Sequence, residues 1–223
     1  MLITISNVLD GDQLTLLQGL IPALTWKDGA ETAGHVAKQV KHNQQAELSS
    51  GVGPKIEKVL HHAVIGNPVL KAAAIPHRFS NFLLSKTETG GGYGLHIDNP
   101  FMQAGAHALR TDLSFTLFLS SPQDYAGGEL VIEHSGQCHA LKPEAGDLIL
   151  YPSTSLHKVA TVTSGVRLAC VGWIESRIKH AADRETLFDL SNLNAELQPR
   201  FDEQSAEMLM LSKVMANLKR RFS

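Results

Sequence analysis

The sequence contains little cysteine and has no long apolar run. Its two cysteines, Cys138 and Cys170, form no CxxC pair, so a disulfide scaffold or a structural zinc site is not expected. We predict that both are reduced, buried thiols. No apolar stretch approaches the ~18 residues that a membrane span needs, and the N-terminus lacks a basic segment followed by an apolar one. These absences predict a cytoplasmic chain with no membrane segment.

The chain also lacks an excess of charge of either sign. Its 20 basic and 22 acidic residues give a formal net charge of −2, which offers no broad cationic field for phosphates. Nucleic acid is therefore not an expected partner. Its 223 residues are 43% apolar and 19% charged, which is too apolar for a disordered chain. This composition favours one large domain or a domain with appendages.

The first third of the chain has the pattern of helices. Apolar residues recur at helical spacing over 13–20 and 55–65, and a weakly amphipathic helix is predicted over 29–48, with Val36 and Val40 on one side. We assign residues 1–70 to an N-terminal helical part that packs on the core.

Residues 71–177 have the pattern of a β core. Short apolar or β-branched runs alternate with glycine-rich turns at 82–84, 113–119, 129–133, 147–151, 157–162 and 166–175. Many short strands at this spacing are typical of a sandwich or barrel. The fold class predicted is mainly β with flanking helices.

Residues 178–223 form a predicted C-terminal helical extension with two apolar stripes. The first contains Ile178, Ala182, Leu187, Leu190, Leu193 and Leu197, and the second contains Met208, Leu211, Met215 and Leu218. The second stripe is a narrow seam. It fits two outcomes, a homo-oligomer joined through this helix or packing of the helix on its own domain.

Three residues, His96, Asp98 and His157, are candidate metal ligands. His96 and Asp98 in YGLHIDNP are spaced i, i+2, so an extended backbone directs both side chains to one face. His157 follows the predicted strand DLILY and the PSTS loop. Two imidazoles and one carboxylate would leave three coordination positions open, which suits non-haem Fe(II), although zinc accepts the same donors.

Arg167 favours iron with an organic co-substrate. It lies ten residues after His157 in the otherwise apolar strand VRLACVGW. A guanidinium in such a strand needs a buried anion, and its planar fork suits a carboxylate. An internal salt bridge is the alternative explanation.

The HxD pair, the distant histidine and a basic residue ten positions later resemble the Fe(II)/2-oxoglutarate dioxygenases of the prolyl-4-hydroxylase-like branch. Segments 110–133 and 146–176 are similar, more specifically, to the bacterial PKHD-type hydroxylases. The resemblance implies a double-stranded β-helix, or jelly roll, with helices around it. It also implies hydroxylation of a substrate with release of succinate and CO₂.

The resemblance implies roles for five residues. His96, Asp98 and His157 would hold Fe(II), and Arg167 would bind the distal carboxylate of 2-oxoglutarate. Tyr93 falls where related hydroxylases place an aromatic side chain near the co-substrate, and a structural role fits it equally. L-ascorbate is an accessory reductant implied by the family.

The substrate, a small molecule or a peptide, is not defined by these residues. Met102 stands where the family tends toward arginine, so a substrate contact there is altered. Other candidate substrate contacts are Phe101 and Arg110 in 99–112, Asp124 and Tyr125 in 120–127, and Arg78.

Two other functions remain open from the residues themselves. One is a non-catalytic, metal-containing β-barrel that binds or senses iron or a small acid. The other is a zinc hydrolase, which is disfavoured because no glutamate base accompanies the ligands. Formation of succinate in the presence of Fe(II), O₂ and 2-oxoglutarate distinguishes the hydroxylase from both.

Overall fold

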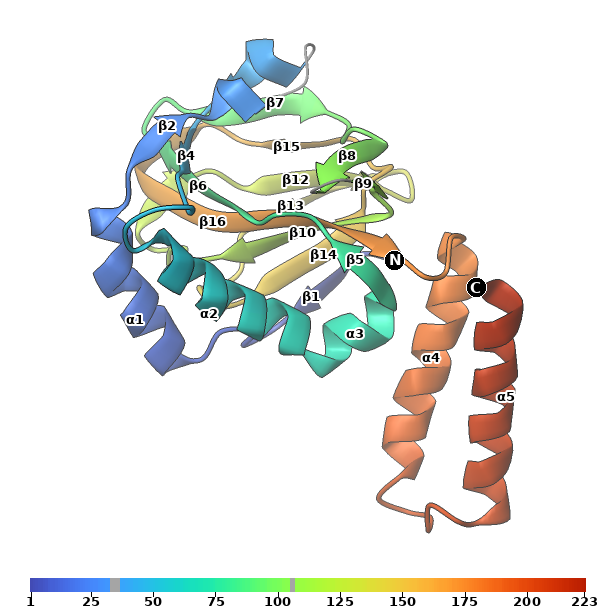
Figure 1. Ribbon diagram of the computed structural model, residues 1–223. Coiled ribbons are helices and arrows are strands. Elements are labelled where there is room, and N and C mark those ends of the chain that lie inside the picture. The colour runs from blue at the N-terminus through green and yellow to red at the C-terminus, as the bar shows by residue number, and fades with distance from the viewer. Residues whose placement is uncertain (33–36, 105–106) are drawn as a thin grey trace.

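Two antiparallel β-sheets face each other and form the centre of the molecule (Figure 1). The computed structural model describes residues 1–32, 37–104 and 107–223. The larger sheet has the strand order β1 (Ile3–Ile5), β14 (Leu148–Pro152), β10 (Leu113–Phe118), β16 (Val162–Ser176), β6 (Leu83–Glu88), β4 (Gln44–Ala46) and β2 (Trp26–Asp28). Strands β5 (Pro76–Phe79) and β11 (Tyr125–Gly127) also pair with β16.

The smaller sheet has the order β13 (Gln137–Leu141), β12 (Leu130–His134), β15 (His157–Val159), β7 (Gly92–His96) and β3 (Lys41–His42). A separate hairpin of β8 (Phe101–Ala104) and β9 (His107–Arg110) lies beside the two sheets. This arrangement is the double-stranded β-helix with N-terminal and C-terminal helices that the sequence predicts.

Three helices cover the outer face of the larger sheet: α1 (Gly11–Leu20), α2 (Gly53–Gly66) and α3 (Pro68–Ala74) (Figure 1). On α2, the fully buried Ile56, Leu60 and Val64 repeat every four residues, so one stripe of the helix faces the sheet. Their partners include Phe115 of β10 and Cys170 of β16. The main hydrophobic core therefore lies between the helices and the larger sheet, outside the barrel.

Strand β16 separates this core from the barrel interior. Cys170 and Ile174 belong to the core under the helices, whereas Arg167 and Trp173 line the cavity inside the barrel. Residues of opposite parity point to opposite faces of a strand. One strand thus supplies both the core and the functional cavity.

The predicted helix over 29–48 is wrong wherever the structure describes it. Short 3₁₀ turns occupy Gly29–Thr32 and Ala37–Val40, and β3 and β4 follow them. Gln44 and Gln45 of β4 pair with Lys86 and Ser85 of β6, so sheet pairing overrides the weak helical pattern. Val36 lies outside the described residues.

The two cysteines differ in burial. Cys170 is buried as predicted, but Cys138 is exposed, so the prediction of two buried thiols is wrong for Cys138. The reason is topological, because β13 is an edge strand of the smaller sheet and much of it meets solvent. Both thiols are free.

The C-terminal extension is a helical hairpin of α4 (Ala181–Leu197) and α5 (Ala206–Phe222), as predicted. It projects away from the sheets, with α4 beside α3 and α5 beside α4 (Figure 1). Leu193 was predicted in the apolar stripe, yet 45% of its surface is exposed. None of the helices in the described ranges is long and apolar enough to cross a membrane. The division of the chain at residues 70 and 177 stays a prediction.

Candidate active site

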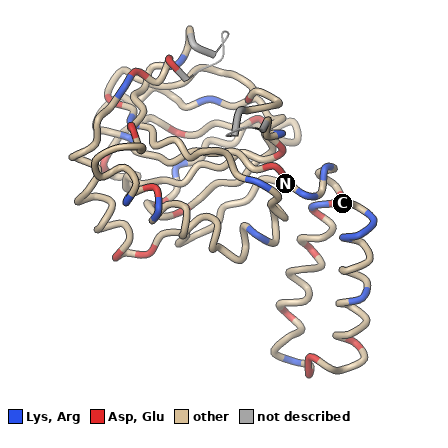
Figure 2. The backbone as a smooth tube through the Cα atoms, in the orientation of Figure 1, with Lys and Arg blue, Asp and Glu red and all other residues tan. Residues whose placement is uncertain are grey.

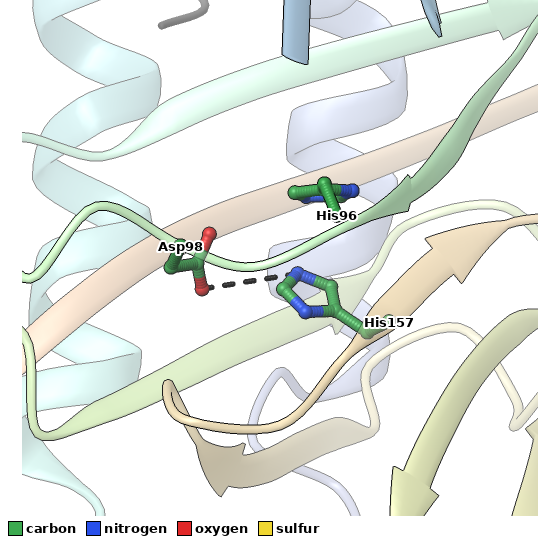
Figure 3. A group of neighbouring side chains, drawn as sticks. All are labelled: His96, Asp98 and His157. Carbon is green, nitrogen blue, oxygen red and sulfur yellow. Dashed lines mark ion pairs between the residues drawn. The ribbon is translucent and has the colours of Figure 1, made fainter. Parts of the chain in front are cut away.

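The three predicted metal ligands converge on one point between the sheets. His96 ends β7, Asp98 follows it two residues later, and His157 begins the neighbouring strand β15. Their ligand atoms all lie within 4.8 Å of one another (Figure 3). His157 is only 4% exposed. One metal ion is within reach of all three side chains.

Backbone carbonyls orient both imidazoles. Nδ1 of His96 lies 2.8 Å from the carbonyl oxygen of Gly94, and Nδ1 of His157 lies 3.0 Å from that of Ser155. Because a carbonyl only accepts, each Nδ1 carries the proton and each Nε2 presents its lone pair. This hydrogen-bonded outer layer is typical of histidines that bind a metal.

A serine pair orients the carboxylate. Ser114 Oγ of β10 donates a 2.6 Å hydrogen bond to Asp98 Oδ2 and lies 2.7 Å from Ser153 Oγ. The same Oδ2 is 3.8 Å from Nε2 of His157, the contact drawn in Figure 3. The larger sheet thus fixes a ligand of the smaller sheet.

Burial keeps the site ready for a cation. Desolvation and the neighbouring His157 lower the pKa of His96 to about 4, so its imidazole is neutral at physiological pH. Two aromatic rings pack against the ligands. Tyr93 stacks on His96 at 3.6 Å between ring centroids, and Tyr151 meets His157 edge-on at 5.1 Å.

The donor set fits a ferrous ion. Two neutral imidazole nitrogens and one carboxylate oxygen, held on a rigid sheet, leave coordination positions open for other ligands. A structural zinc site would instead close its coordination sphere with four protein donors. No fourth His, Cys, Asp or Glu joins the group within the part of the chain that the structure describes.

A cavity of about 110 Å³ opens beside the triad. Its walls come from both sheets and include His96, Asp98 and His157 together with Tyr93, Arg167 and Trp173. Ser85 and Thr87 of β6 add hydroxyl groups to the wall. The cavity therefore combines a metal site with a polar lining.

Arg167 lines this cavity as a buried cation, and none of the ion pairs among the described residues involves it. It is 2% exposed, and its guanidinium carbon lies 5.1 Å from the centre of the Phe118 ring. Nε and Nη2 have no hydrogen-bond partner within residues 1–32, 37–104 and 107–223. Burial lowers the pKa of Arg167 from its ordinary value, as expected for a desolvated charge. Within the part of the chain that the structure describes, Arg167 forms no internal salt bridge, contrary to that alternative.

Of the other candidate residues, some line the cavity and others are exposed or bound in ion pairs. Met102 lines the cavity, whereas Phe101 beside it is 64% exposed. Arg78 is bound to Glu175 at 2.9 Å through Nε, and Arg110 is bound to Asp112 at 2.7 Å, so both arginines are committed to ion pairs. The same side chains tie the β8–β9 hairpin to β5 and β16, because Arg78 Nη2 donates to the carbonyl of Ala108 and Arg110 Nη2 donates to that of Ser176.

The segment 120–127 does not reach the cavity. Asp124 is exposed, and Tyr125 is 4% exposed beside Arg167, outside the cavity wall. Lys142 Nζ lies 4.0 Å from the centre of the Tyr125 ring, which fixes the side chain in place.

Sequence reasoning missed two residues of the site. Ser114 was recognisable from the alternation in LSFTLF, where small polar residues occupy every second position and so share the face opposite the leucines. Lys41, which is 7% exposed and lines the cavity, carried no such signal, because it lies in the segment mistaken for a helix.

Comparison with known proteins agrees with this geometry. Residues 82–175, which include the three ligands, match the 2OG-Fe(II) oxygenase superfamily. Together with a full-length relative, this match shows that the chain is a 2-oxoglutarate-dependent Fe(II) oxygenase. A "PKHD-type hydroxylase" of Hyphomonas neptunium is 50% identical over 222 residues, which span 100% of this chain and 99% of the relative. The chain therefore belongs to the PKHD-type hydroxylases.

Solved structures support the same fold. A prolyl hydroxylase of Trichoplax adhaerens, solved with a hypoxia inducible factor peptide, superposes with a TM-score of 0.58 at 19% identity over 85% of this chain and 86% of its own. A viral collagen prolyl hydroxylase of Paramecium bursaria Chlorella virus 1, solved with 2-oxoglutarate, gives 0.53 at 16% identity over 78% and 95%. Both show a shared architecture.

Proposed function

We propose that this Fe(II)- and 2-oxoglutarate-dependent hydroxylase binds the distal carboxylate of its co-substrate through Arg167. The observation that supports this role is the buried guanidinium in the wall of the triad's cavity, whose Nε and Nη2 have no hydrogen-bond partner among the described residues. A carboxylate satisfies both nitrogens at once through parallel hydrogen bonds. Without an anion, the buried charge is costly.

Each part of the site has a separate task in the reaction. His96, Asp98 and His157 hold the ion, which when bound activates O₂ for oxidative decarboxylation of the co-substrate and hydroxylation of the substrate. The backbone carbonyls and Ser114 keep the three ligands in position. The buried rings of Phe115 and Tyr151 in the cavity wall help to exclude water from the reacting groups.

Tyr93 belongs to the same proposal. Its ring stacks on His96, and burial together with Asp98 raises the pKa of its phenol to about 12, so the hydroxyl keeps its proton. A protonated phenol in the cavity wall is a hydrogen-bond donor for the co-substrate. The stacking contact also fixes the orientation of the His96 imidazole. A contact of Tyr93 with the co-substrate and a structural role for its ring are therefore compatible.

The entrance indicates a substrate with an apolar group, either a small molecule or a peptide side chain. Ile97 lines the cavity and is also 56% exposed, which places it at the mouth. Met102 lines the same cavity, and the exposed Phe101 lies next to it in the sequence. Such side chains favour apolar contact over recognition of a charged group. The cytoplasm stays the predicted compartment, and the need for ascorbate stays a prediction of the family resemblance.

The experiment is an anaerobic titration of the Fe(II)-loaded chain with 2-oxoglutarate, followed by admission of O₂. Chelation by the co-substrate is expected to give a visible charge-transfer band, and O₂ is expected to convert 2-oxoglutarate to succinate. A chain that binds Fe(II) but gives neither the band nor succinate contradicts the function. Small molecules and peptides with apolar groups are then screened for coupled succinate formation, in the wild type and in Met102→Arg.

A further inference from the structure

The C-terminal hairpin lacks the burial that normally stabilises helices. Helix α5 has 17 residues, and Met208 is its one buried residue. A helix of this length is marginal in water unless an apolar face is covered. The residues of the two helices that face each other, called here the inward rows, are only half-buried: Leu190 and Leu197 on α4, and Leu211 and Leu218 on α5.

A second apolar surface flanks the inward rows. Leu193, Met210 and Val214 are 45%, 58% and 42% exposed. Leu193 lies three residues after Leu190 and four before Leu197 on α4. Val214 has the same spacing from Leu211 and Leu218 on α5. Equivalent positions on two antiparallel helices lie on the same side of the pair, and Met210 is one turn from Val214. The three side chains therefore form one face, called here the outer apolar face.

Charge is separated along the hairpin. Four acidic residues and one basic residue gather around its loop, called here the acidic end: Glu196, Asp202, Glu203, Glu207 and Arg200. Three basic residues end α5, called here the basic end, beside Asp183 and Glu185 at the start of α4: Lys219, Arg220 and Arg221. Figure 2 shows blue concentrated at the free end of α5, and red together with one blue segment at the loop. None of the ion pairs found among the described residues involves these eight side chains.

We propose that the outer apolar face binds a second copy of this chain. The two hairpins lie antiparallel about a two-fold axis and form a four-helix bundle. In this arrangement the basic end of each copy lies over the acidic end of the other, so both charge contacts form at once. A parallel arrangement would bring like charges together and is disfavoured. Leu193, Met210 and Val214 then become buried at the centre of the bundle.

Sedimentation of the full chain at micromolar concentrations measures the association directly. The wild type is expected to sediment at twice its monomer mass of 24.2 kDa. A variant carrying Met210→Glu and Val214→Glu places two unpaired carboxylates in the apolar centre, so its dimer affinity is expected to fall by at least about 100-fold. Leu16→Glu on α1 is the matched control, because Leu16 is also exposed, at 38%, and lies outside the hairpin. It is expected to leave the dimer intact.

Charge exchange tests the antiparallel arrangement. One variant carries Glu203→Lys and Glu207→Lys, and the other carries Lys219→Glu and Arg221→Glu. Each variant by itself places like charges opposite each other and is expected to be monomeric. A mixture of the two restores opposite charges at both contacts, so a heterodimer is expected. A change that merely unfolds the hairpin cannot be rescued by mixing.

Turnover of 2-oxoglutarate, measured in parallel, keeps this proposal separate from the function of the metal site. All four hairpin and control variants are expected to retain it, because none of the changed residues contacts the cavity. A monomeric wild type overturns the proposal even if turnover is normal. Charge variants that are dimeric by themselves also overturn the proposal, as does a mixture of the two that stays monomeric.

Discussion

His157 lies directly opposite His96 on the neighbouring antiparallel strand, with the two ring centroids 4.2 Å apart. The pairing register of β15 and β7 therefore sets the distance between two ligands that are distant in the sequence. Asp98 lies two residues beyond His96, and its Oδ2 is 3.8 Å from Nε2 of His157, so the carboxylate lies near both imidazoles. A shift of this register by one residue would turn one imidazole to the opposite face of the sheet.

Loss of one ligand is expected to remove the metal while leaving the fold. In His157→Ala, a carboxylate and a single imidazole remain, and we expect affinity for Fe(II) to fall by more than about 100-fold, beyond the loss seen for outer-layer changes. Anaerobic calorimetry measures the affinity, and succinate formation is expected to cease. The control is His62→Ala on α2, because His62 is exposed and distant from the triad in sequence and fold. Unchanged succinate formation in His157→Ala would contradict the site.

Ser114→Ala is expected to weaken the metal site without removing a ligand. Asp98 loses the 2.6 Å hydrogen bond that fixes its orientation, and such changes typically reduce metal affinity by about 10–100-fold. The control is Ser120→Ala. The Ser120 hydroxyl donates to the carbonyl of Val166 and accepts from the amide of Leu168, so this change removes two hydrogen bonds away from the triad. The control should lower thermal stability and keep metal affinity, and equal metal affinities in the two variants would refute the role of Ser114.

Arg167→Ala is expected to separate co-substrate binding from metal binding. Removing a buried partner of a charge pair costs about 2–5 kcal/mol, so we expect the KM for 2-oxoglutarate to rise by roughly 30-fold or more while Fe(II) affinity is retained. Arg78→Ala is the control, since Arg78 is bound to Glu175 and lies outside the cavity wall. It should leave this KM unchanged. A parallel loss of Fe(II) from Arg167→Ala would indicate a structural role instead.

The metal site was predictable because each of its ligands has a local signal. The HxD spacing places two donors on one face, and His157 follows a recognisable strand and loop. The sequence also places Arg167 in an apolar strand, where a charge needs an explanation. The pattern could not show that Arg78 forms an ion pair, because its partner Glu175 reaches it only through the fold. Asp112, the partner of Arg110, was visible in the sequence two residues away.

The N-terminal segment was harder to predict, since its structure depends on distant strands. Gln44 and Gln45 have weak local preferences and become strand residues because β6 offers an unpaired edge. Lys41 enters the cavity for the same reason, through the pairing of β3 with β7. Pairings of this kind join residues 40 or more positions apart and leave no periodic signal in the segment itself.

Gly172→Ala is expected to destabilise the core. A Cβ added at Gly172 would lie 2.7 Å from two ring atoms of Phe115 and 3.2 Å from Phe82, and both rings are buried. Overpacking of this kind typically costs about 1–3 kcal/mol in the free energy of unfolding. The control is Gly19→Ala on α1, where an added Cβ meets nothing within 4 Å. This second change should raise stability by about 0.5–1 kcal/mol. Urea denaturation measures both, and a neutral Gly172→Ala would show that the rings can move.

Lys41 is expected to make the stability of the metal-free chain depend on alkaline pH. Burial lowers the pKa of its ammonium from 10.5 to about 8, although Asp28 and Asp98 partly oppose the shift. In the unfolded chain the group keeps its ordinary pKa. Between pH 8 and 10.5 the unfolded state therefore binds a proton that the folded state does not, and the free energy of unfolding rises with pH. Below pH 8 both states are protonated and the cost of burying the charge is constant.

The variant Lys41→Met isolates this contribution, because every other titrating group is common to the two chains. Relative to the variant, the wild type should gain up to about 3 kcal/mol in the free energy of unfolding between pH 8 and 10.5, at roughly 1.4 kcal/mol per unit of pKa shift. Urea denaturation of the two metal-free chains at several pH values measures the difference. If that difference is the same at pH 8 and at pH 10.5, Lys41 titrates normally and its ammonium is better solvated than its 7% exposure indicates.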